Sequence, residues 1–489
     1  MTVKELEPKI IFEIFDEITK VPRPSKKEEK IRQYLLDFAK KHNIAVKTDE
    51  IGNVLMSVPA TPGYENAPTV VMQGHMDMVC ESNDKSFDFE NSPIETYVDG
   101  EWVKAKGTTL GADNGIGLAA GMAALLDDSF VHGPLEVLCT VDEETGLTGA
   151  NNLGDGMLKD GSILLNLDSE EDAQLFIGCA GGVDTTAVFS YKRSFAPTDF
   201  KYFKMSVENG LGGHSGTDIH LDRANANKIA ARFLFDIMKK YGKDVIISEF
   251  DGGNLRNAIA RAAHVVFGVA VDDKELIRVA MNEYAATIAN EYKAVEPNLE
   301  LKLESVEKPE YCLNGETTYR LVGALYACPH GVQAMSQDIP GMVETSTNLA
   351  AVKMQPNNEI LITTSQRSSV ESRKWDIAHQ VETVFLLAGA KVSHSDGYPG
   401  WAPNVNSPIM AIARDAYEEL YGEKPLVTAM HAGLECGLFL TKYPNLDMVS
   451  FGPTLIGVHS PMEKMHIPAV QKFWKHLKLI LTKVADLKK

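Results

Sequence analysis

Apolar residues recur at helical spacing near the start of the chain and in short runs farther along. We expect helices over residues 5–19 and 26–41, the second introduced by Pro24-Ser25 with Glu28 in a capping box. From there to about Gly182, short apolar runs alternate with helical stretches. This order of strand, loop and helix is typical of an open α/β sheet.

The pattern changes beyond residue 199. Shorter strands and longer helices follow, with helices expected over residues 225–240 and 372–387. After the Pro- and Gly-rich connection H-S-D-G-Y-P-G-W-A-P-N, a helix over residues 407–421 leads back to the first pattern. The sequence therefore predicts an inserted α+β unit within an α/β chain.

Composition narrows the class of protein. A chain of 489 residues exceeds one ordinary core and implies at least two domains. A formal net charge of -19 argues against nucleic acid as a partner. We expect neither a signal peptide nor a membrane span, because no apolar stretch is long enough. The expected location is cytoplasmic, and the six cysteines, which have no C-x-x-C spacing, are expected to be reduced and mostly buried.

His75 and Asp77 stand two residues apart where the apolar run from Val70 to Met72 gives way to glycine. Alternation along a strand places both side chains on one face. A histidine that binds a metal usually has its second ring nitrogen held by a carboxylate, which sets the tautomer. The pattern favours His75 as a metal ligand and Asp77 as its orienting partner. For these two residues alone, a solvated strand end is the alternative.

Acidic residues lie near the ends of other apolar runs. Asp113 lies in a glycine-rich loop ahead of a helical stretch, residues 134–141 lead to Glu143 and Glu144, and another strand ends in Asp168. In an open α/β sheet, ligands bind beyond the carboxyl ends of the strands, so these side chains should converge on one crevice. Converging carboxylates are electrostatically unfavourable unless cations lie between them.

A further histidine, His459, follows an apolar run near the C-terminus in S-F-G-P-T-L-I-G-V-H-S-P-M-E. A mixed set of imidazole and carboxylate ligands suits zinc or manganese better than calcium, which prefers oxygen alone. For Glu143 and Glu144, a solvated loop is the alternative interpretation of the residues by themselves.

Seven segments spread over nearly the whole chain carry a family resemblance: G-H-M-D-M-V, G-T-T-L-G-A-D-N-G-I-G, N-L-D-S-E-E, C-A-G-G-V-D, G-G-H-S-G, H-A-G-L-E-C-G-L-F and G-P-T-L-I-G-V-H-S-P. The chain resembles the di-zinc aminoacylase and carboxypeptidase superfamily of metallopeptidases. Within it, the chain is most similar to the peptidase D family of aminoacyl-histidine (Xaa-His) dipeptidases. Several segments in the family's order are far more specific than any one of them.

The resemblance implies a site for two divalent metal ions, zinc in the first place, with manganese or cobalt sharing the same ligands. Asp113 would bridge the two metals. His75 and Asp168 would complete one metal site, and Glu144 and His459 the other. The resemblance also implies a cis peptide bond after Asp113.

Glu143 would be the general base, and Asp77 would orient His75. We expect the adjacent residues Glu143 and Glu144 at a strand end to point in different directions, so that one binds metal while the other faces the water. Two metals roughly 3.5 to 4 Å apart lower the pKa of a bridging water and polarise the scissile carbonyl, so no covalent nucleophile is required.

The resemblance places substrate-binding residues in the insert. His214 would stabilise the oxyanion and, in dimeric relatives, reaches the neighbouring subunit's site; a histidine that orders a glycine turn is the alternative. Asn257 would bind substrate, although the family usually has proline where this chain has Ala260. Arg367 would bind the peptide's C-terminal carboxylate through its guanidinium fork, with a surface arginine as the alternative. His431 and Glu435 would line the pocket.

The resulting expectation is a discontinuous catalytic domain, residues 1–185 and 398–489, with an inserted α+β lid and dimerisation domain, residues 186–397. The enzyme would be a homodimer that hydrolyses unblocked dipeptides, preferentially Xaa-His, with metal-activated water. An N-acyl amino acid deacylase or a broader di- or tripeptidase is the alternative on the same scaffold. A non-catalytic binding protein is less consistent with the intact ligand set.

Overall fold

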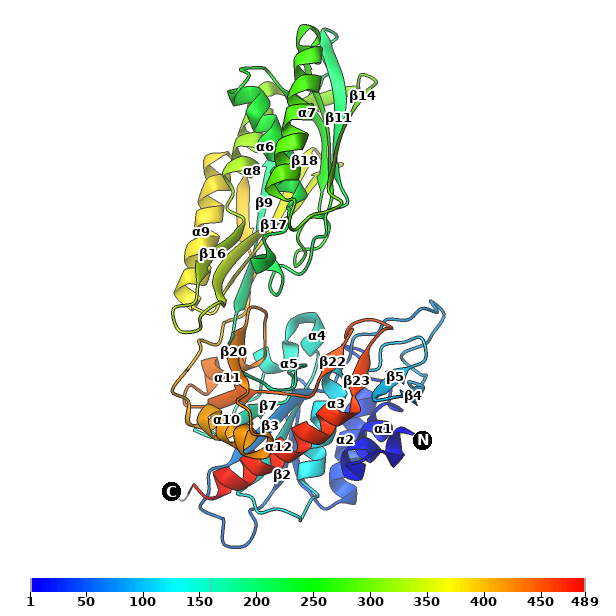
Figure 1. Ribbon diagram of the computed structural model, residues 1–489, viewed down its shortest axis with the longest axis vertical. Helices are drawn as coiled ribbons and strands as arrows, with labels where there is room; N and C mark the ends of the chain where they lie inside the picture. Colours follow the sequence, from blue (N-terminus) through cyan, green and yellow to red (C-terminus); the bar gives the residue numbers. More distant parts are fainter. Residues whose placement is uncertain (1, 160, 488–489) are drawn as a thin grey trace. The chain divides into compact units, whose positions relative to one another are not determined.

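A computed structural model describes residues 2–159 and 161–487. The chain divides into two units (Figure 1). Unit 1 comprises Met1–Cys179, Trp401–Ala429 and Leu434–Lys489, and unit 2 comprises Ala180–Gly400 and Met430–Gly433. The insertion is therefore a property of the folded chain, since unit 2 interrupts unit 1.

The unit boundaries differ in detail from those expected from the sequence, which were 185/186 and 397/398. The segment Met430–Gly433 belongs to unit 2, although the sequence pattern placed it in the catalytic part. The backbone N–H of Ala180 donates hydrogen bonds to the carbonyls of Met430 and Ala432, at 2.9 and 3.1 Å. The roles of catalytic domain, lid and dimerisation surface stay predictions.

Unit 1 is built on an eight-stranded mixed sheet of order β1-β2-β6-β3-β7-β21-β8-β20. Its central strands β6, β3, β7 and β21 run parallel, and the outer pairs β1/β2, β2/β6 and β21/β8 are antiparallel. The strands are β1 (Ala45–Thr48), β2 (Val54–Val58), β3 (Val70–His75), β6 (Leu135–Thr140), β7 (Ile163–Asn166), β8 (Gln174–Cys179), β20 (Leu426–Met430) and β21 (Asp447–Ser450). Every residue of β3 and β7 is buried, as expected for central parallel strands.

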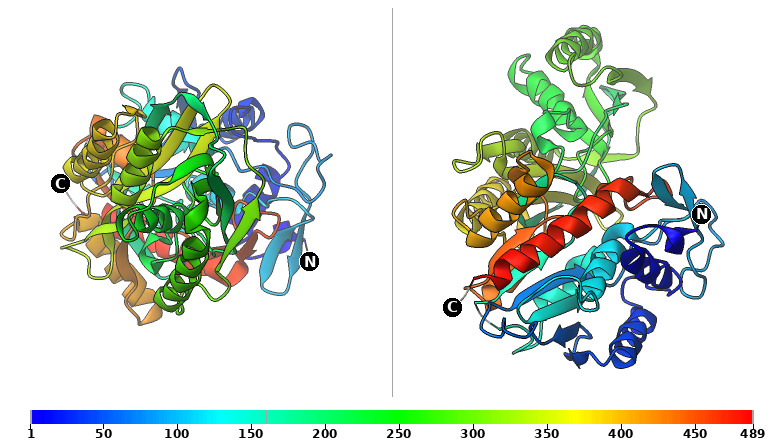
Figure 2. Two further views of the ribbon diagram at one scale, coloured as in Figure 1. Left: turned by 90° about the horizontal axis from the view of Figure 1, so that it is seen from above. Right: turned by 60° about the horizontal axis from the view of Figure 1, so that its bottom comes forward.

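A four-stranded sheet, order β22-β23-β5-β4, completes the strands of unit 1: β4 (Thr96–Asp99), β5 (Trp102–Ala105), β22 (Leu455–Ile456) and β23 (Lys464–His466). The helices are η1 (Val3–Glu5), α1 (Lys9–Ile18), α2 (Glu29–Lys41), α3 (Ala112–Ala124), α4 (Glu143–Gly146), α5 (Thr148–Asn151), α10 (Pro408–Tyr421), α11 (Cys436–Lys442) and α12 (Ile467–Ala485). Helix α3 packs on β3, and α12, drawn in red, packs on α10 (Figure 2).

The beginning of α2 corrects one expectation. The helix begins at Glu29, with Glu28 in the N-cap position and no side-chain capping hydrogen bond. Ser25 Oγ donates instead to Asp77 Oδ2 at 2.8 Å, and the Glu28 carboxylate accepts from the backbone N–H of Lys26 and Asp142. The capping-box prediction is wrong because tertiary partners take both side chains.

Unit 2 contains a nine-stranded sheet of order β14-β11-β13-β12-β17-β18-β9-β19, with β16 paired to β17. The strands are β9 (Gly181–Ser190), β11 (Phe200–Glu208), β12 (Ile246–Gly252), β13 (Ala263–Ala270), β14 (Glu300–Val306), β16 (Gly331–Met335), β17 (Val343–Gln355), β18 (Glu359–Ser368) and β19 (Lys391–His394). A separate pair joins β10 (Arg193–Phe195) and β15 (Tyr311–Leu313).

Helices cover this sheet (Figure 1), and α6, α7, α8 and α9 contribute buried residues to a large apolar core with it. The helices of unit 2 are η2 (Ile219–Leu221), α6 (Ala226–Lys239), η3 (Val271–Asp273), α7 (Lys274–Glu291), α8 (Gly315–Ala327) and α9 (Glu371–Leu387). Alternate residues of β11, such as Phe203 and Met205, belong to that core together with Phe233 of α6 and Phe385 of α9. Alternation along a strand explains why these residues share one face.

Two of the expected helices, α6 and α10, begin with a side-chain cap. The Asn225 side chain accepts from the backbone N–H of Lys228 at the start of α6, and Ser407 caps α10, with Pro408 in the first turn. Each cap contributes about 1 kcal/mol. All six cysteines are free, and all but Cys80 are buried. Within the described residues, no helix combines the length and apolar character needed to cross a membrane.

Candidate active site

Three neighbouring parallel strands of unit 1 end at the same edge of the sheet. His75 is the last residue of β3, Glu143 and Glu144 follow β6, and Asp168 follows β7. Carboxyl ends of parallel strands form the usual ligand-binding edge of such sheets. The buried, apolar strands therefore place an imidazole and three carboxylates at one edge of the sheet.

His75 is almost completely buried, at 1% exposure, and both of its ring nitrogens face carboxylates. Its Nε2 lies 2.9 Å from Asp113 Oδ1 and 3.3 Å from Asp168 Oδ1. Its Nδ1 lies 3.3 Å from Asp77 Oδ1 and 3.2 Å from the Asp77 carbonyl oxygen. A proton on Nδ1 is thereby held by Asp77, which leaves Nε2 directed toward the other two carboxylates.

Asp113 lies between the two histidines of the set. Its Oδ1 faces His75, and its Oδ2 lies 3.0 Å from Nε2 of His459. The same Nε2 lies 3.2 Å from Glu144 Oε2. His75, Asp113 and Glu144 form one group able to hold a metal ion. The peptide bond between Asp113 and Asn114 is cis, so that prediction is confirmed.

Glu143 and Glu144 follow β6 and begin the short helix α4, which the sequence pattern did not predict. The Asp77 carboxylate accepts from the backbone N–H of Glu143 at 3.0 Å and of Glu144 at 3.3 Å. Both glutamates stand just beyond a strand end, as expected, in a helical turn whose first N–H groups donate to a buried carboxylate. Asp77 therefore positions His75 and both glutamates together.

Two further buried residues support the loop around Asp113, and the sequence analysis assigned neither. The Glu463 carboxylate accepts from the backbone N–H groups of Leu110, Gly111, Ala112 and Asp113, at 2.7 to 3.3 Å. The Arg23 guanidinium donates to the backbone carbonyls of Met76, Asp77 and Gly111. The available signal for Glu463 was its place four residues after His459, in G-V-H-S-P-M-E.

The closely spaced carboxylates and the burial of this site change the pKa values of its residues. Burial lowers the pKa of His75, but the Asp168 charge and hydrogen-bonded carboxylates outweigh it and raise that pKa well above its ordinary value. A hydrogen bond with Asp113 is the largest effect that raises the pKa of His459 to about 11. Burial raises the pKa of Asp168 to about 6 and that of Glu143 well above the ordinary range. Bound cations would take the place of these protons.

A second observation supports these side chains as metal ligands. Glu144 Oε1 and Asp168 Oδ1 are buried and make no hydrogen bond among the described residues. A buried acceptor left without a partner costs about 1 to 3 kcal/mol. Coordination would satisfy both oxygens, and imidazole with carboxylate is a ligand set that zinc and manganese accept.

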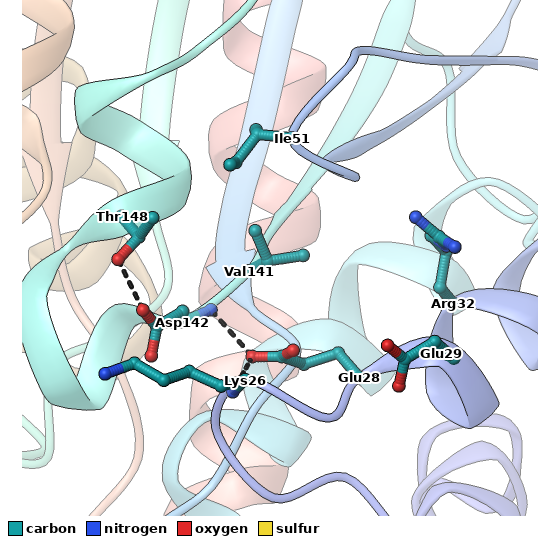
Figure 3. A pocket seen from close by; sticks show the side chains of 8 residues that line it. All are labelled: Lys26, Glu28, Glu29, Arg32, Ile51, Val141, Asp142 and Thr148. Atoms are coloured by element: carbon teal, nitrogen blue, oxygen red, sulfur yellow. Dashed lines mark hydrogen bonds between the residues drawn. The ribbon is translucent and has the colours of Figure 1, made fainter.

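A neighbouring acidic group has no need of a cation. Glu28, Asp77 and Asp142 also lie close enough to hold one, beside a pocket lined by Lys26, Glu28, Glu29, Arg32, Ile51, Val141, Asp142 and Thr148 (Figure 3). Their carboxylates already accept hydrogen bonds, for example Asp142 Oδ1 from the Thr145 hydroxyl at 2.5 Å. This group fixes the loop before α4 through hydrogen bonds.

Glu435 is fully buried in unit 1, behind the strand ends. Its Oε2 accepts from Thr140 Oγ1 at 2.8 Å and from Gln73 Nε2 at 2.5 Å, while Oε1 makes no hydrogen bond with any residue that the structure describes. Burial raises its pKa to about 8. Its partners come from β3 and β6, so its carboxyl belongs to the surroundings of the site on unit 1.

Unit 2 brings together three other candidates. The backbone N–H of Ser215, next to His214, donates to the Asn257 carbonyl at 2.7 Å. His431 Nε2 lies 2.7 Å from Ser346 Oγ, and the His431 carbonyl faces Gly216 of the same loop. His214 Nδ1 accepts from the backbone N–H groups of the residues that follow it, so its proton lies on Nε2 and makes that atom a donor.

Arg367, near the end of β18, is not a surface arginine, since only 7% of it is exposed. Its Nη1 donates to the Tyr398 hydroxyl at 2.9 Å, and its Nε has no hydrogen-bond partner in the described part of the chain. Within residues 2–159 and 161–487, no carboxylate forms an ion pair with it. A buried guanidinium in this state is suited to an anionic ligand.

Comparison with known proteins decides the family. Residues 71–483 match Peptidase family M20/M25/M40. The chain belongs to this family. It is 42% identical over 483 residues to the cytosol non-specific dipeptidase of Escherichia coli (strain K12), covering 99% of both chains.

Solved structures place this member of the M20/M25/M40 family on the same fold. The aminoacylhistidine dipeptidase from Vibrio alginolyticus matches with a TM-score of 0.90 and 42% identity, over 99% of this chain and 98% of that one. A tripeptidase from Staphylococcus aureus matches at a TM-score of 0.58 and 16% identity, over 98% and 99%, which shows the fold alone. The protein is therefore a peptidase, and the expected α/β class with its insertion is confirmed.

Proposed function

We propose that this M20/M25/M40 peptidase hydrolyses unblocked dipeptides with two divalent metal ions, zinc in the first place. The observation that carries the proposal is Asp113, whose two carboxylate oxygens face two different histidines. His75 and Asp168 would hold one ion, Glu144 and His459 the other, and Asp113 would bridge them. Manganese and cobalt share these preferences, so the ligands alone do not select the metal.

The bound ions would activate a water and polarise the scissile carbonyl. Glu143 takes the proton of the attacking water at its carboxylate and passes it to the leaving amine. Burial raises the pKa of the Glu143 carboxyl, and the positive charge of bound metal ions would lower it, so that the carboxylate could accept the proton. Asp77 keeps a proton on His75 Nδ1, so that Nε2 stays directed toward Asp113 and Asp168.

The residues of unit 2 would recognise the substrate. His214, with its proton on Nε2, would donate to the developing oxyanion, a contribution that is worth about 3 to 4 kcal/mol in other hydrolases. Arg367 would bind the terminal carboxylate of the dipeptide, Asn257 and His431 would contact the remainder, and Glu435, which belongs to unit 1, would line the pocket. We further propose a cytoplasmic homodimer, in keeping with the name of the E. coli relative and the family resemblance.

The names of two relatives bear on the preferred dipeptide. One relative is named a non-specific dipeptidase and the other an aminoacylhistidine dipeptidase, and each is 42% identical to this chain. We propose a preference for histidine at the C-terminal position, including carnosine-like substrates. A deacylase or a broader di- or tripeptidase is the alternative that the same site accommodates.

A panel of peptides tests substrate class and metal together. Protein of measured metal content is assayed with Xaa-His, His-Xaa, carnosine, apolar dipeptides, tripeptides, and N-acetylated or C-amidated controls. The proposal predicts fastest turnover of Xaa-His and loss of turnover on acetylation. Turnover of N-acetyl amino acids with none of free dipeptides would identify a deacylase instead.

A further inference from the structure

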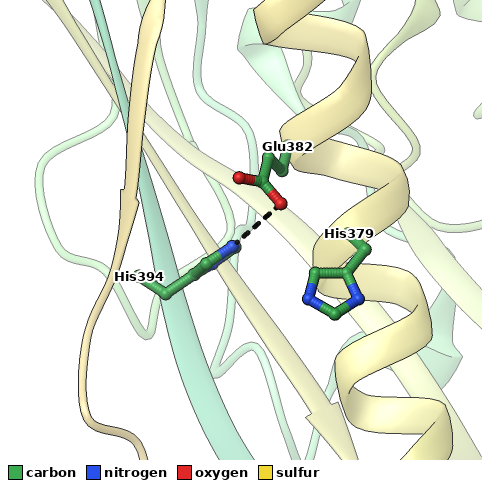
Figure 4. A group of neighbouring side chains, drawn as sticks. All are labelled: His379, Glu382 and His394. Carbon is green, nitrogen blue, oxygen red and sulfur yellow. Dashed lines mark ion pairs between the residues drawn. The ribbon is translucent and has the colours of Figure 1, made fainter.

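Three metal-ligand side chains gather within unit 2, between helix α9 and the edge strand β19 (Figure 4). His379 and Glu382 stand three residues apart on α9 and so share one face of the helix. His394 is the last residue of β19. One ligand atom from each residue lies within 4.8 Å of the other two. None of the three belongs to the proposed catalytic set.

Hydrogen bonds fix the proton of the His394 ring. Gln366 Nε2 donates to the hydroxyls of Thr347 and Thr364, so its amide oxygen faces Thr185. The Thr185 hydroxyl donates to that oxygen at 2.7 Å. Because the Thr185 hydroxyl proton is donated to Gln366, Thr185 Oγ1 accepts a hydrogen bond from His394 Nδ1, at 2.9 Å. In a neutral ring, Nε2 of His394 therefore carries a lone pair and no proton.

That lone pair meets another acceptor. Among the described residues, His394 Nε2 has no hydrogen-bond partner although it is buried, and Glu382 Oε2 lies 3.4 Å from it. Two acceptors facing each other need a cation between them, either a proton or a metal ion. Two ligand atoms at about 2.0 to 2.1 Å from a tetrahedral zinc ion lie about 3.3 Å apart. The observed separation of the nitrogen and the oxygen fits such an ion without rearrangement.

His379 distinguishes a metal site from a simple ion pair. A protonated His394 needs Glu382 alone, but a second imidazole lies beside it, with ring centroids 6.0 Å apart. The Trp375 ring packs against both histidines, at centroid distances of 5.9 and 5.7 Å. Two imidazoles and one carboxylate beside an aromatic wall are typical ligands and surroundings for divalent zinc, cobalt, nickel or copper.

We propose that His379, Glu382 and His394 bind one divalent transition-metal ion, which joins α9 to the edge strand β19. The site is separate from the catalytic set, and its occupancy does not depend on the dipeptidase proposal. The Thr185 hydroxyl, which fixes the Nδ1 proton, takes the role that a carboxylate or carbonyl plays behind many metal-bound histidines.

Zinc content tests the site directly. Full-length wild type, Glu382→Gln and His394→Gln are equilibrated with buffered free Zn²⁺ and analysed for bound metal by elemental analysis. His264→Gln is the matched control, since His264 is another partly buried histidine of unit 2 that contacts a hydroxyl, Ser206 Oγ. Each cluster variant should bind one zinc fewer per chain than wild type and the control, with peptidase activity unchanged. Equal zinc content in all four proteins would overturn the proposal.

A second readout does not rely on counting metal. Ni²⁺ bound at the cluster should quench the fluorescence of Trp375, which contacts both histidines. Wild type, Glu382→Gln and Trp375→Phe, first dialysed against a chelator so that zinc does not occupy the cluster, are titrated with Ni²⁺, and the quenching common to all three is subtracted. The proposal predicts quenching in wild type that both variants lack. Identical quenching in wild type and Glu382→Gln would contradict the proposal. This holds even if one of the variants is less stable than wild type.

Discussion

The Glu463 carboxylate accepts a hydrogen bond from the backbone N–H of Asp113, at 3.3 Å, and from the three N–H groups that precede it. Glu463 is 3% exposed and stands four residues after His459. One carboxylate thus connects the loop of the proposed bridging ligand to the segment that carries a histidine ligand. We regard Glu463 as a positioning residue.

Glu463→Gln should weaken metal binding while the fold persists. The amide replaces one acceptor oxygen by an NH₂ group, which faces backbone N–H donors and cannot hold the loop as the carboxylate does. Loss of such supporting partners typically costs about 10- to 100-fold in metal affinity. The measurement is metal retention against buffers of known free zinc, with the exposed Glu50→Gln as control. Affinity equal to wild type would remove Glu463 from this role.

Arg367→Met should impair substrates that have a free C-terminal carboxylate. Hydrogen bonds to charged groups contribute about 1.5 to 3 kcal/mol, so kcat/KM should fall by about 10- to 100-fold. The variant and wild type should differ much less on a C-amidated peptide. Arg373→Met, at an exposed arginine of unit 2 that pairs with Glu344, is the matched control. An equal loss on both substrates would point to a structural role for Arg367.

His214 can be tested for action across a homodimer. Inactive Glu143→Ala and His214→Ala subunits are dissociated, mixed and reassociated. If His214 serves the partner's site, each mixed dimer regains one complete site, and random pairing restores about one quarter of wild-type activity. If mixed dimers are demonstrated and no activity returns, His214 acts within its own chain or not at all.

His476 should make the stability of the protein pH-dependent. Its buried ring donates from Nε2 to the Ala413 carbonyl at 2.7 Å, and burial lowers its pKa to about 4. Because the unfolded chain binds the proton more readily, this stabilisation is complete above pH 6.5 and declines as the pH falls toward 4. Between pH 7.5 and 5 the loss should be about 2 kcal/mol.

The check is urea unfolding of wild type and His476→Gln across that pH range. Glutamine keeps a donor near Ala413 but does not titrate, so the variant should show a shallower decline than wild type by that amount. Parallel pH profiles for the two proteins would mean that His476 is protonated without cost in the folded state.

Strand ends were the part of the site that the sequence predicted well. Apolar runs followed by His75, Glu144 and Asp168 become buried parallel strands, and the carboxyl ends of such strands must meet. Polar side chains whose partners are distant in sequence were harder to interpret. Ser25 matches a capping box but binds Asp77, and the turn at Glu143 is helical because its N–H groups donate to that same carboxylate.

Hydrogen-bond partners that are distant in sequence also explain which features the sequence analysis did not predict. Glu463 binds backbone groups about 350 residues earlier, and backbone N–H groups have no signature in the sequence. The segment Met430–Gly433 joins unit 2 because Ala180 bonds to it, although its sequence neighbours belong to unit 1. Periodicity predicts which face of an element is buried, and it does not predict which distant loop supplies a hydrogen-bond partner.

The central claim is that Glu143 acts on water while its neighbour Glu144 binds metal. The most direct measurement compares metal content and dipeptide turnover in Glu143→Gln and Glu144→Gln after the same dialysis. We expect wild-type metal content in Glu143→Gln with turnover reduced about 10²- to 10⁴-fold, the usual contribution of a general base, and loss of one metal ion in Glu144→Gln. Equal metal loss in both variants, or wild-type turnover by Glu143→Gln, would contradict it.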